Sequence, residues 1–159
     1  MKKTNAARIL DRLKISYELI EYEVDESDLS AVHVAATAQI QIDQVYKTLV
    51  LEGDKTGNFV CIIPGGDEID LKKAALASSN KKVAMIPMKE LEPLTGYIRG
   101  GCSPLGMKKN FPVYIDTSAF DQPVIYISAG VRGMQIKLAP DDLVMACKAK
   151  KAEIAAENN

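Results

Sequence analysis

A lysine inside an apolar run is the first residue whose type and place suggest chemistry. Lys47 lies in the segment 45–51, whose composition predicts a β-strand. If Val45, Lys47 and Leu49 share one face, the ammonium group lies among apolar neighbours, which is unfavourable unless an anion or a carbonyl oxygen meets it. The alternative is a lysine at a strand end whose stem packs on the protein while its ammonium reaches solvent. Composition alone favours that alternative.

The second candidate is the glycine-rich segment from Gly96 to Gly106, which also contains Pro104. Glycine lets a backbone approach a ligand closely, and successive N–H groups can form a concave site for an anion or a carbonyl oxygen. Lys108 and Lys109 follow and add local positive charge. The alternative is an ordinary long turn followed by a solvated pair of lysines.

The third candidate is the run of small residues from Ser128 to Gly133, directly after an apolar segment. Small residues at the end of a strand suit the wall of a pocket, and they equally suit the turn of a β-hairpin. The residues by themselves favour the hairpin.

Conventional catalytic and metal-binding groups are scarce. Cys102 has no base near it in sequence, and His33 is the single histidine, so a Cys–His pair is disfavoured. No CxxC, GxxxxGK[ST] or GxGxxG pattern occurs. An acidic group at positions 67, 68 and 70 could bind a hard cation, although capping of a helix by Asp70 is the simpler explanation. We therefore expect neither a metal nor a cofactor.

Composition sets further limits. The 159 residues suit one domain over positions 1–159, and 20 basic against 21 acidic side chains give a net charge of -1. That balance argues against wrapping of DNA or other long nucleic acids, but it leaves room for a local pocket for a nucleic-acid end. No apolar run approaches the roughly 18 residues of a membrane span, and no signal-peptide core is evident. Three widely spaced cysteines fit a reducing cytoplasm.

Periodicity and turn signals predict alternating elements. Helices are expected at 4–14 with Thr4 as N-cap, at 31–39, at 70–78 with Asp70 as N-cap, at 87–91, and from Pro140 onward into a tail that frays after about Ala152. Strands are expected at 16–24, 45–51, 59–64, 82–85, 111–116, 124–128 and 135–138, with a hairpin turn at 53–58 and the strand at 59–64 central. The pattern indicates a single α/β or α+β domain around a mixed sheet surrounded by helices.

Three segments together resemble the YbaK/EbsC family of aminoacyl-tRNA deacylases. They are DQVYKTL at 43–49, DLKK at 70–73 and TGYIRGGCSPLGMKK at 95–109. The resemblance extends from Thr4 to about Ile154 in the family's order and spacing, and it rests on the strand lysine combined with the GYxxGGxSPxG loop. The family consists chiefly of Cys-tRNA(Pro) deacylases related to the editing domain of bacterial prolyl-tRNA synthetases. It implies the YbaK type of fold, described as an aminoacyl-tRNA synthetase-associated domain.

The resemblance implies a cytoplasmic trans-editing hydrolase that is free of metal and needs no cofactor. Its partner is the acceptor end of tRNA(Pro) carrying a wrong amino acid, with prolyl-tRNA synthetase as a further partner, and no membrane is involved. Editing is needed because a pocket for proline discriminates poorly by size alone. By resemblance Lys47 is the catalytic lysine, and the loop from Gly100 to Pro104 borders the aminoacyl pocket with its amides. The implied substrate-binding residues are Tyr22, Tyr97, Gly100, Gly101, Cys102, Ser103, Pro104, Ser128 and Gly130.

The chain departs from the family pattern at four places. Cys102 stands where relatives often have an aliphatic residue, and Ala129 and Val131 replace residues that are often Gly and Lys. Gln135 stands where some relatives carry an acidic residue. These departures bear on amino-acid preference, including cysteine against alanine, more than on the reaction.

Because the residues offer no convincing nucleophile, the hydrolysis implied by the resemblance has to use one from the substrate. The cysteinyl thiol, which would cyclise, or the ribose hydroxyl acting on water could serve. The protein would then supply positioning, a cation and carbonyl-polarising amides. Three alternatives stay open: a module that binds aminoacyl groups or tRNA ends without cleavage, an accessory protein of cell-surface regulation, and a deacylase that prefers Ala-tRNA(Pro).

Overall fold

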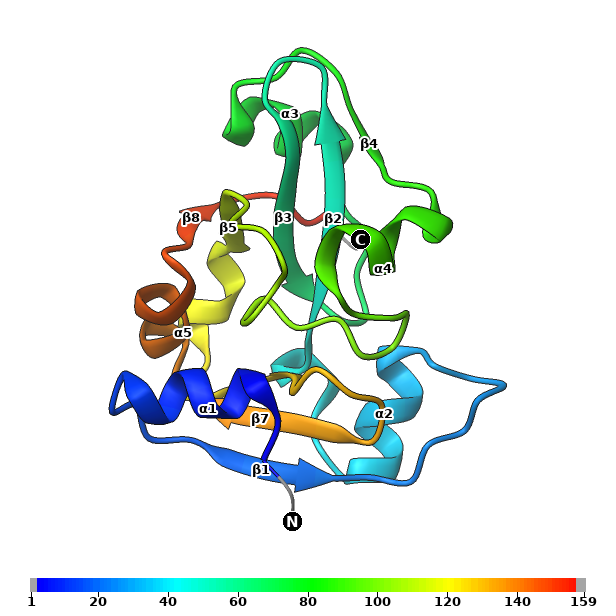
Figure 1. Cartoon of the computed structure of the whole chain (residues 1–159), viewed down its shortest axis with the longest axis vertical. Helices are drawn as coiled ribbons and strands as arrows, with labels where there is room; N and C mark the ends of the chain where they lie inside the picture. The colour runs from blue at the N-terminus through cyan, green and yellow to red at the C-terminus, as the bar shows by residue number, and fades with distance from the viewer. Residues whose placement is uncertain (1–2, 157–159) are drawn as a thin grey trace.

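The computed structural model describes residues 3–156 and folds them into strands flanked by short helices (Figure 1). The helices are α1 (Asn5–Arg12), α2 (Ala31–Ala38), α3 (Leu71–Ser78), α4 (Leu91–Thr95) and α5 (Pro140–Cys147), with 3-10 turns η1 (Ile42–Gln44), η2 (Met88–Glu90) and η3 (Thr117–Asp121). The strands are β1 (Glu18–Glu21), β2 (Tyr46–Gly53), β3 (Gly57–Pro64), β4 (Val83–Met85), β5 (Val113–Asp116), β6 (Ile125–Ser128), β7 (Met134–Leu138) and β8 (Lys150–Ala152).

The strands form two sheets. The larger has the order β4-β2-β3-β5-β8 and is mixed, because β2 is antiparallel to β3 and β4 while β3, β5 and β8 run parallel. The smaller has the order β1-β7-β6 and is antiparallel. A parallel bridge between Val45 and Tyr126 joins the two at the start of β2. The expected α/β fold with a mixed sheet is confirmed, and its division into two sheets is new.

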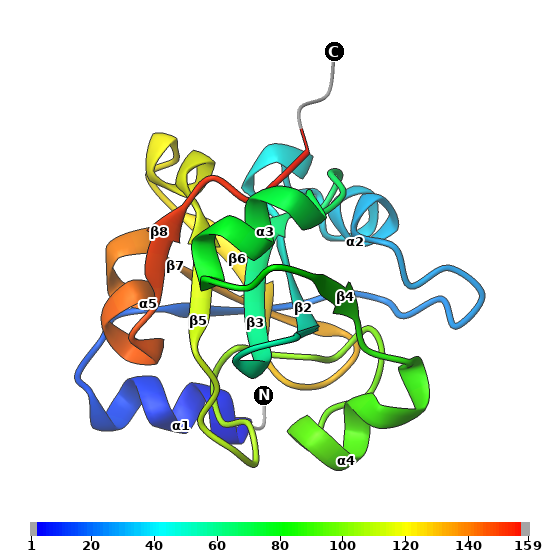
Figure 2. The same ribbon diagram turned by 90° about the horizontal axis from the view of Figure 1, so that it is seen from above.

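The two faces of the β2–β3 hairpin pack against different parts of the chain. Val50 and Ile62 belong to a cluster that includes Leu10 of α1, Leu143 of α5 and the apolar residues of β6 and β7. Residues on the opposite face, among them Phe59 and Ile63, pack against α3, which lies across the hairpin (Figure 2). Because β3 is covered on both faces, its residues 59–63 are fully buried, which confirms that this apolar strand is central.

Local signals place the helix starts as expected. The Thr4 hydroxyl accepts a hydrogen bond from the N–H of Ala7, and the Asp70 carboxylate accepts bonds from the N–H groups of Lys72 and Lys73. Each cap satisfies N–H groups that have no partner within the helix. The segment after Pro87 forms η2 followed by α4, and residues 129–133 are the hairpin connection between β6 and β7 that the residues favoured.

The C-terminal tail differs from the expectation. α5 ends at Cys147, where Lys148 adopts the left-handed conformation, and β8 then pairs with β5. The prediction that the tail frays after about Ala152 is wrong, because Ile154 is fully buried and Ala155 bridges to Ile69. The Lys/Ala/Glu composition concealed this, since Ile154 is the one large apolar side chain that anchors residues 150–156, and main-chain pairing and the Asp116 carboxylate hold the rest. Among residues 3–156 no helix has the length and apolar character to cross a membrane.

Candidate functional site

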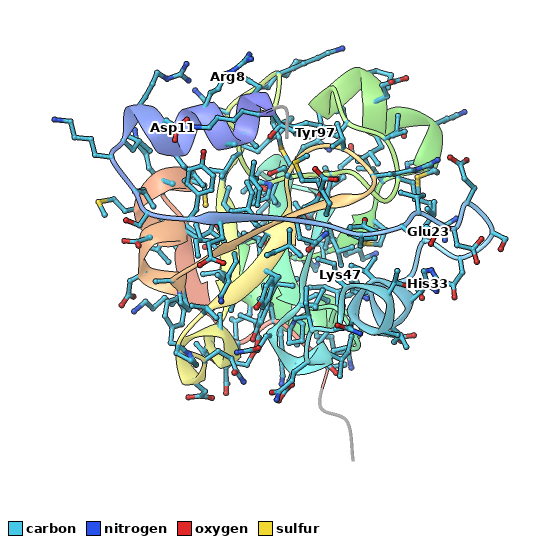
Figure 3. All side chains as sticks on the ribbon, turned by 90° about the horizontal axis from the view of Figure 1, so that it is seen from below. Arg8, Asp11, Glu23, His33, Lys47 and Tyr97 are labelled. Atoms are coloured by element: carbon cyan, nitrogen blue, oxygen red, sulfur yellow. The ribbon has the colours of Figure 1, made fainter. Side chains whose placement is uncertain are left out.

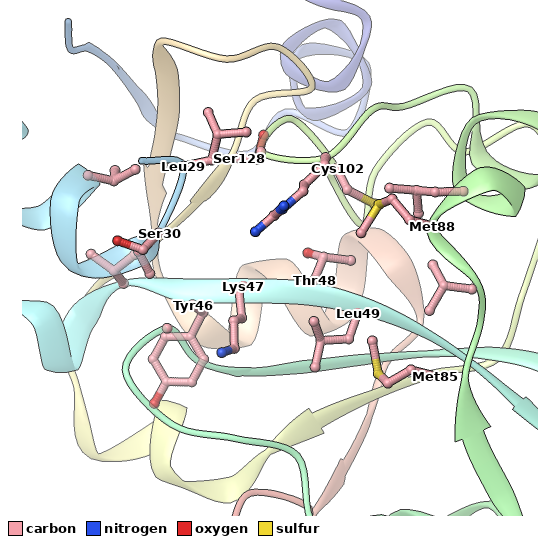
Figure 4. Close-up of a pocket in the computed structure, with 18 of the residues that line it drawn as sticks. Leu29, Ser30, Tyr46, Lys47, Thr48, Leu49, Met85, Met88, Cys102 and Ser128 are labelled. Atoms are coloured by element: carbon pink, nitrogen blue, oxygen red, sulfur yellow. The ribbon is translucent and has the colours of Figure 1, made fainter. Parts of the chain in front are cut away.

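A pocket of about 370 Å³ lies along the edge of β2 (Figure 4). β4 pairs only with residues 51–53 of β2, so the first half of β2 has no neighbour from the larger sheet on that side. The remaining walls come from the start of α2, from the segment 85–91, from the loop at 99–102, and from the facing ends of β6 and β7. The pocket therefore exists because the sheet stops at this edge and loops from distant parts of the chain cover it.

Lys47 lines this pocket as a half-buried cation without a partner. Its side chain leaves β2 on the opposite side from that of Thr48 (Figure 4), as alternation along a strand requires. Its ammonium makes no hydrogen bond or ion pair within residues 3–156. Burial lowers the pKa of Lys47, and the charges of Glu68 and Asp67 oppose that effect. An unpartnered ammonium at a pocket wall is able to bind an anion or a developing negative charge.

The glycine-rich loop meets the pocket at only two of the expected positions. Gly100 and Cys102 line the pocket, whereas Gly101, Ser103 and Pro104 are buried outside the lining. The N–H of Gly101 donates to the carbonyl of Ile98 at 3.0 Å, so this amide is engaged within the loop. A side chain at Gly101 would meet the backbone of Val131 and Arg132 at about 3.2 Å, which shows how closely the loop packs on the β6–β7 turn. Ser103 Oγ accepts from the N–H of Leu105 and holds the loop's shape.

Three further expected residues lie outside the pocket. Tyr97 and Gly130 line a second cavity of about 420 Å³ beside the start of α1, and the Tyr97 hydroxyl donates to the carbonyl of Leu105. Figure 3 shows Tyr97 next to α1 and well away from Lys47. Tyr22 follows β1, where its N–H donates to the carbonyl of Gly133. Of the residues expected to bind substrate, the structure brings Gly100, Cys102 and Ser128 to the pocket of Lys47.

Among residues 3–156 the lining of the pocket contains hydroxyl groups and one thiol but no histidine to act as their base. Burial raises the pKa of the Cys102 thiol to about 12, so it is protonated at neutral pH. His33 does not line the pocket; its Nε2 lies 3.2 Å from the hydroxyl of Thr37 and its Nδ1 lies 3.9 Å from the Asp28 carboxylate. Within residues 3–156, no three His, Cys, Asp or Glu side chains gather in a way that could hold a metal ion.

Sequence reasoning did not propose Thr48 or Arg99 as site residues, and it noted Gln135 only as a departure from the family pattern. Thr48 and Gln135 supply buried polar atoms, and Arg99 adds a second cation at an exposed position. Apolar side chains form the rest of the wall, including the exposed Met85 and Met88. Adjacency to Lys47 was a signal for Thr48, and a glutamine inside the apolar strand β7 was a signal for Gln135. The methionines carry no such signal, because only the fold brings them to β2.

These features define an α/β domain with a small, partly polar pocket at the open edge of its mixed sheet. The chain belongs to the family of aminoacyl-tRNA editing domains, whose model matches residues 26–146. It is 50% identical over 153 residues to EbsC of Enterococcus faecalis, covering 96% of this chain and 93% of that protein, which is provisionally named a Cys-tRNA(Pro)/Cys-tRNA(Cys) deacylase. It is also 26% identical over 121 residues, 76% of each chain, to YwhH of Bacillus subtilis.

Solved structures support the fold. One, a protein provisionally described as a trans-editing enzyme for prolyl tRNA synthetase, has a TM-score of 0.82 at 22% identity and covers 99% of this chain and 100% of that one. Another, a hypothetical protein, has a TM-score of 0.87 at 19% identity and covers 96% of this chain and 100% of that one. The family model and the EbsC relative confirm the resemblance to the YbaK/EbsC family and the expected class of enzyme, an aminoacyl-tRNA deacylase.

Proposed function

We propose that this protein is a trans-editing hydrolase that cleaves the ester bond of mischarged tRNA(Pro), with Cys-tRNA(Pro) as its preferred substrate. The observation that carries the proposal is the half-buried ammonium of Lys47, which has no partner within residues 3–156, in a pocket of about 370 Å³. The family and the name of the EbsC relative support the choice of substrate. Such an activity belongs with translation in the cytoplasm.

The pocket has the size and the surfaces for an aminoacyl group. Its volume lies at the lower end of the range for small-molecule sites, about 300–1,000 Å³. Leu49, Ile86 and Leu91 supply apolar surface for an amino-acid side chain, and Lys47 supplies positive charge for the ester. The net charge of -1 predicts weak affinity for the tRNA body, so prolyl-tRNA synthetase is proposed to hold the tRNA.

The chemistry we propose uses the substrate's own groups. In one route the cysteinyl sulfur attacks the ester carbonyl carbon, the bond to the ribose oxygen breaks, and that oxygen takes up a proton. The cyclic thioester then reacts with water. In the other route the neighbouring ribose hydroxyl orients a water molecule for attack on the carbonyl. Lys47 stabilises the negative oxygen in both routes, and the loop at Gly100 positions the ester.

The test is deacylation of a small panel by the purified protein, with and without prolyl-tRNA synthetase. The panel contains Cys-tRNA(Pro), Ala-tRNA(Pro), Pro-tRNA(Pro) and Cys-tRNA(Cys). We expect Cys-tRNA(Pro) to be cleaved fastest and Pro-tRNA(Pro) to be spared. Faster cleavage of Ala-tRNA(Pro) would overturn the cysteine preference. Binding without hydrolysis of any member would overturn the enzymatic proposal in favour of a binding module.

A further inference from the structure

Two polar atoms of the pocket wall have no hydrogen-bond partner. Thr48 Oγ1 and Gln135 Oε1 are both buried, and neither bonds to another group within residues 3–156. Gln135 is 5% exposed, so its amide oxygen has little access to bulk water. Both residues line the pocket that contains Lys47. Buried polar atoms are nearly always paired, so two unpaired atoms at one pocket indicate a missing ligand.

The two residues lie on the same side of β2. In the ladder between β6 and β7, Gln135 is directly opposite Ser128 and therefore shares its face. The bridge between Val45 and Tyr126 brings β6 alongside β2, and Figure 4 shows the Thr48 side chain projecting toward the side where Ser128 lies. Lys47 leaves β2 on the other side. The pocket thus has two polar regions, one on each side of the open edge of β2.

The chemistry of the two unpaired oxygens requires a ligand that donates hydrogen bonds. An amide oxygen can only accept hydrogen bonds, and a threonine hydroxyl can accept as well as donate. A carboxylate, a phosphate or an ester carbonyl offers lone pairs and would leave Gln135 Oε1 unsatisfied. An ammonium group has three N–H donors and bonds well to neutral oxygens. Because the Lys47 ammonium lies on the opposite side of β2 and Arg99 is exposed, the ammonium of a ligand can occupy this region.

We propose that Thr48 Oγ1 and Gln135 Oε1 together bind the α-ammonium group of the aminoacyl ester. The inference rests on the proposed deacylase function and adds to it a requirement for a free amino group. With the ammonium held here, the ester faces the region of Lys47 and the side chain faces the apolar wall. Peptidyl-tRNA and formylated aminoacyl-tRNA, whose amino groups are acylated, are thereby excluded from cleavage.

The first test compares ligands on the wild-type protein. We expect 3′-cysteinylamino-3′-deoxyadenosine, a stable amide analogue, to bind at least about tenfold more tightly by calorimetry than its counterpart with 3-mercaptopropanoyl in place of cysteinyl. Cys-tRNA(Pro) should likewise be cleaved at least about tenfold faster than its N-acetyl form. Equal binding of the two analogues, or equal cleavage of the two tRNAs, would overturn the inference. If neither tRNA is cleaved but the cysteinyl analogue still binds more tightly than the mercaptopropanoyl analogue, the proposed deacylase function is refuted and the ammonium site is retained.

The second test assigns the effect to these residues. Thr48→Val and Gln135→Met keep size while removing the acceptor, and each should reduce binding of the cysteinyl analogue by about tenfold with little change for the mercaptopropanoyl analogue. Gln135→Glu retains an oxygen acceptor and should preserve the discrimination. Gln122→Met, a glutamine outside the pocket, is the matched control. Equal losses on both analogues would show a structural role only and refute the assignment.

Discussion

Replacing Lys47 with alanine is the most direct test of the pocket's chemistry. The ammonium is half-buried, unpartnered within residues 3–156 and subject to desolvation, so it interacts strongly with any negative charge that develops beside it. Removing one preorganised donor of this kind raises an activation barrier by about 2.7–4 kcal/mol, or on the order of a hundred- to a thousandfold in rate. We therefore expect Lys47→Ala to reduce single-turnover deacylation of Cys-tRNA(Pro) by at least about a hundredfold.

The same structure predicts a small effect on stability. In the β2–β3 ladder Lys47 lies opposite the buried Ile63, so truncation removes contacts of the aliphatic stem. It also removes a charge that burial disfavours, and the two effects oppose each other. We expect the free energy of unfolding to change by less than about 1 kcal/mol. Lys47→Met keeps the stem and should be inactive while unfolding as the wild type does.

Two comparisons make the assay decisive. Lys55→Ala removes an exposed lysine from the β2–β3 turn and should leave the rate unchanged. Lys47→Arg keeps the charge but should remain slow, because a planar guanidinium does not replace a compact ammonium in a confined site. A rate near that of the wild type for both Lys47→Ala and Lys47→Met would refute the reasoning and leave Lys47 as a strand-end lysine.

Four further outcomes follow from the structure. Cys102→Ser should retain most of the deacylation rate, because burial holds the pKa of the thiol at about 12; a hundredfold loss would identify a nucleophile. Treatment with EDTA should leave the rate unchanged, and restoration of a lost rate by Zn²⁺ would contradict this. Asp116→Asn should lower the free energy of unfolding at neutral pH by about 1.5–3 kcal/mol in urea titrations. Burial raises the pKa of Asp116, but hydrogen bonds from Ser118, Ile154 and Ala155 together lower it below 3.8. The stability that the ionised carboxylate contributes in the wild type should therefore be lost as pH falls through that lowered pKa. Asp116→Asn should lack this contribution and its pH dependence. Ile154→Ala should destabilise the protein by about 2–5 kcal/mol, whereas the 83%-exposed Leu76 should tolerate alanine within about 0.5 kcal/mol.

Local chemistry explains why most elements could be predicted from the sequence. The glycines and polar residues at 53–58 encode a hairpin, and Asp70 encodes a helix start, because each acts on its own neighbours. The apolar run 59–64 indicated a central strand for an equally direct reason, since only a strand covered on both faces can bury it.

The set of residues that line the site was harder to predict from the sequence. Lys47, Gly100 and Cys102 were recognised as candidates, but the presence of Thr48 and Gln135 at one pocket depends on how the two sheets join at the Val45–Tyr126 bridge. Tyr97 illustrates the opposite error, because its place in the glycine-rich loop suggested the pocket, while its hydroxyl bonds to Leu105 on the far side of that loop. Long-range pairing of this kind leaves no local pattern in the chain.

The buried C-terminal segment has a consequence for how the protein folds during synthesis. β8 covers the edge of β5, and main-chain bonds join Asp70 to Ile154 and Ala156 to Glu68. These contacts connect residues 150–156 with the middle of the chain. Until they emerge, the free edge of β5 is able to pair with other chains, and the native sheet cannot be completed. Folding of this domain should therefore finish only after residues 150–156 have emerged from the ribosome, and nascent chains that lack β8 should be the species most prone to aggregate.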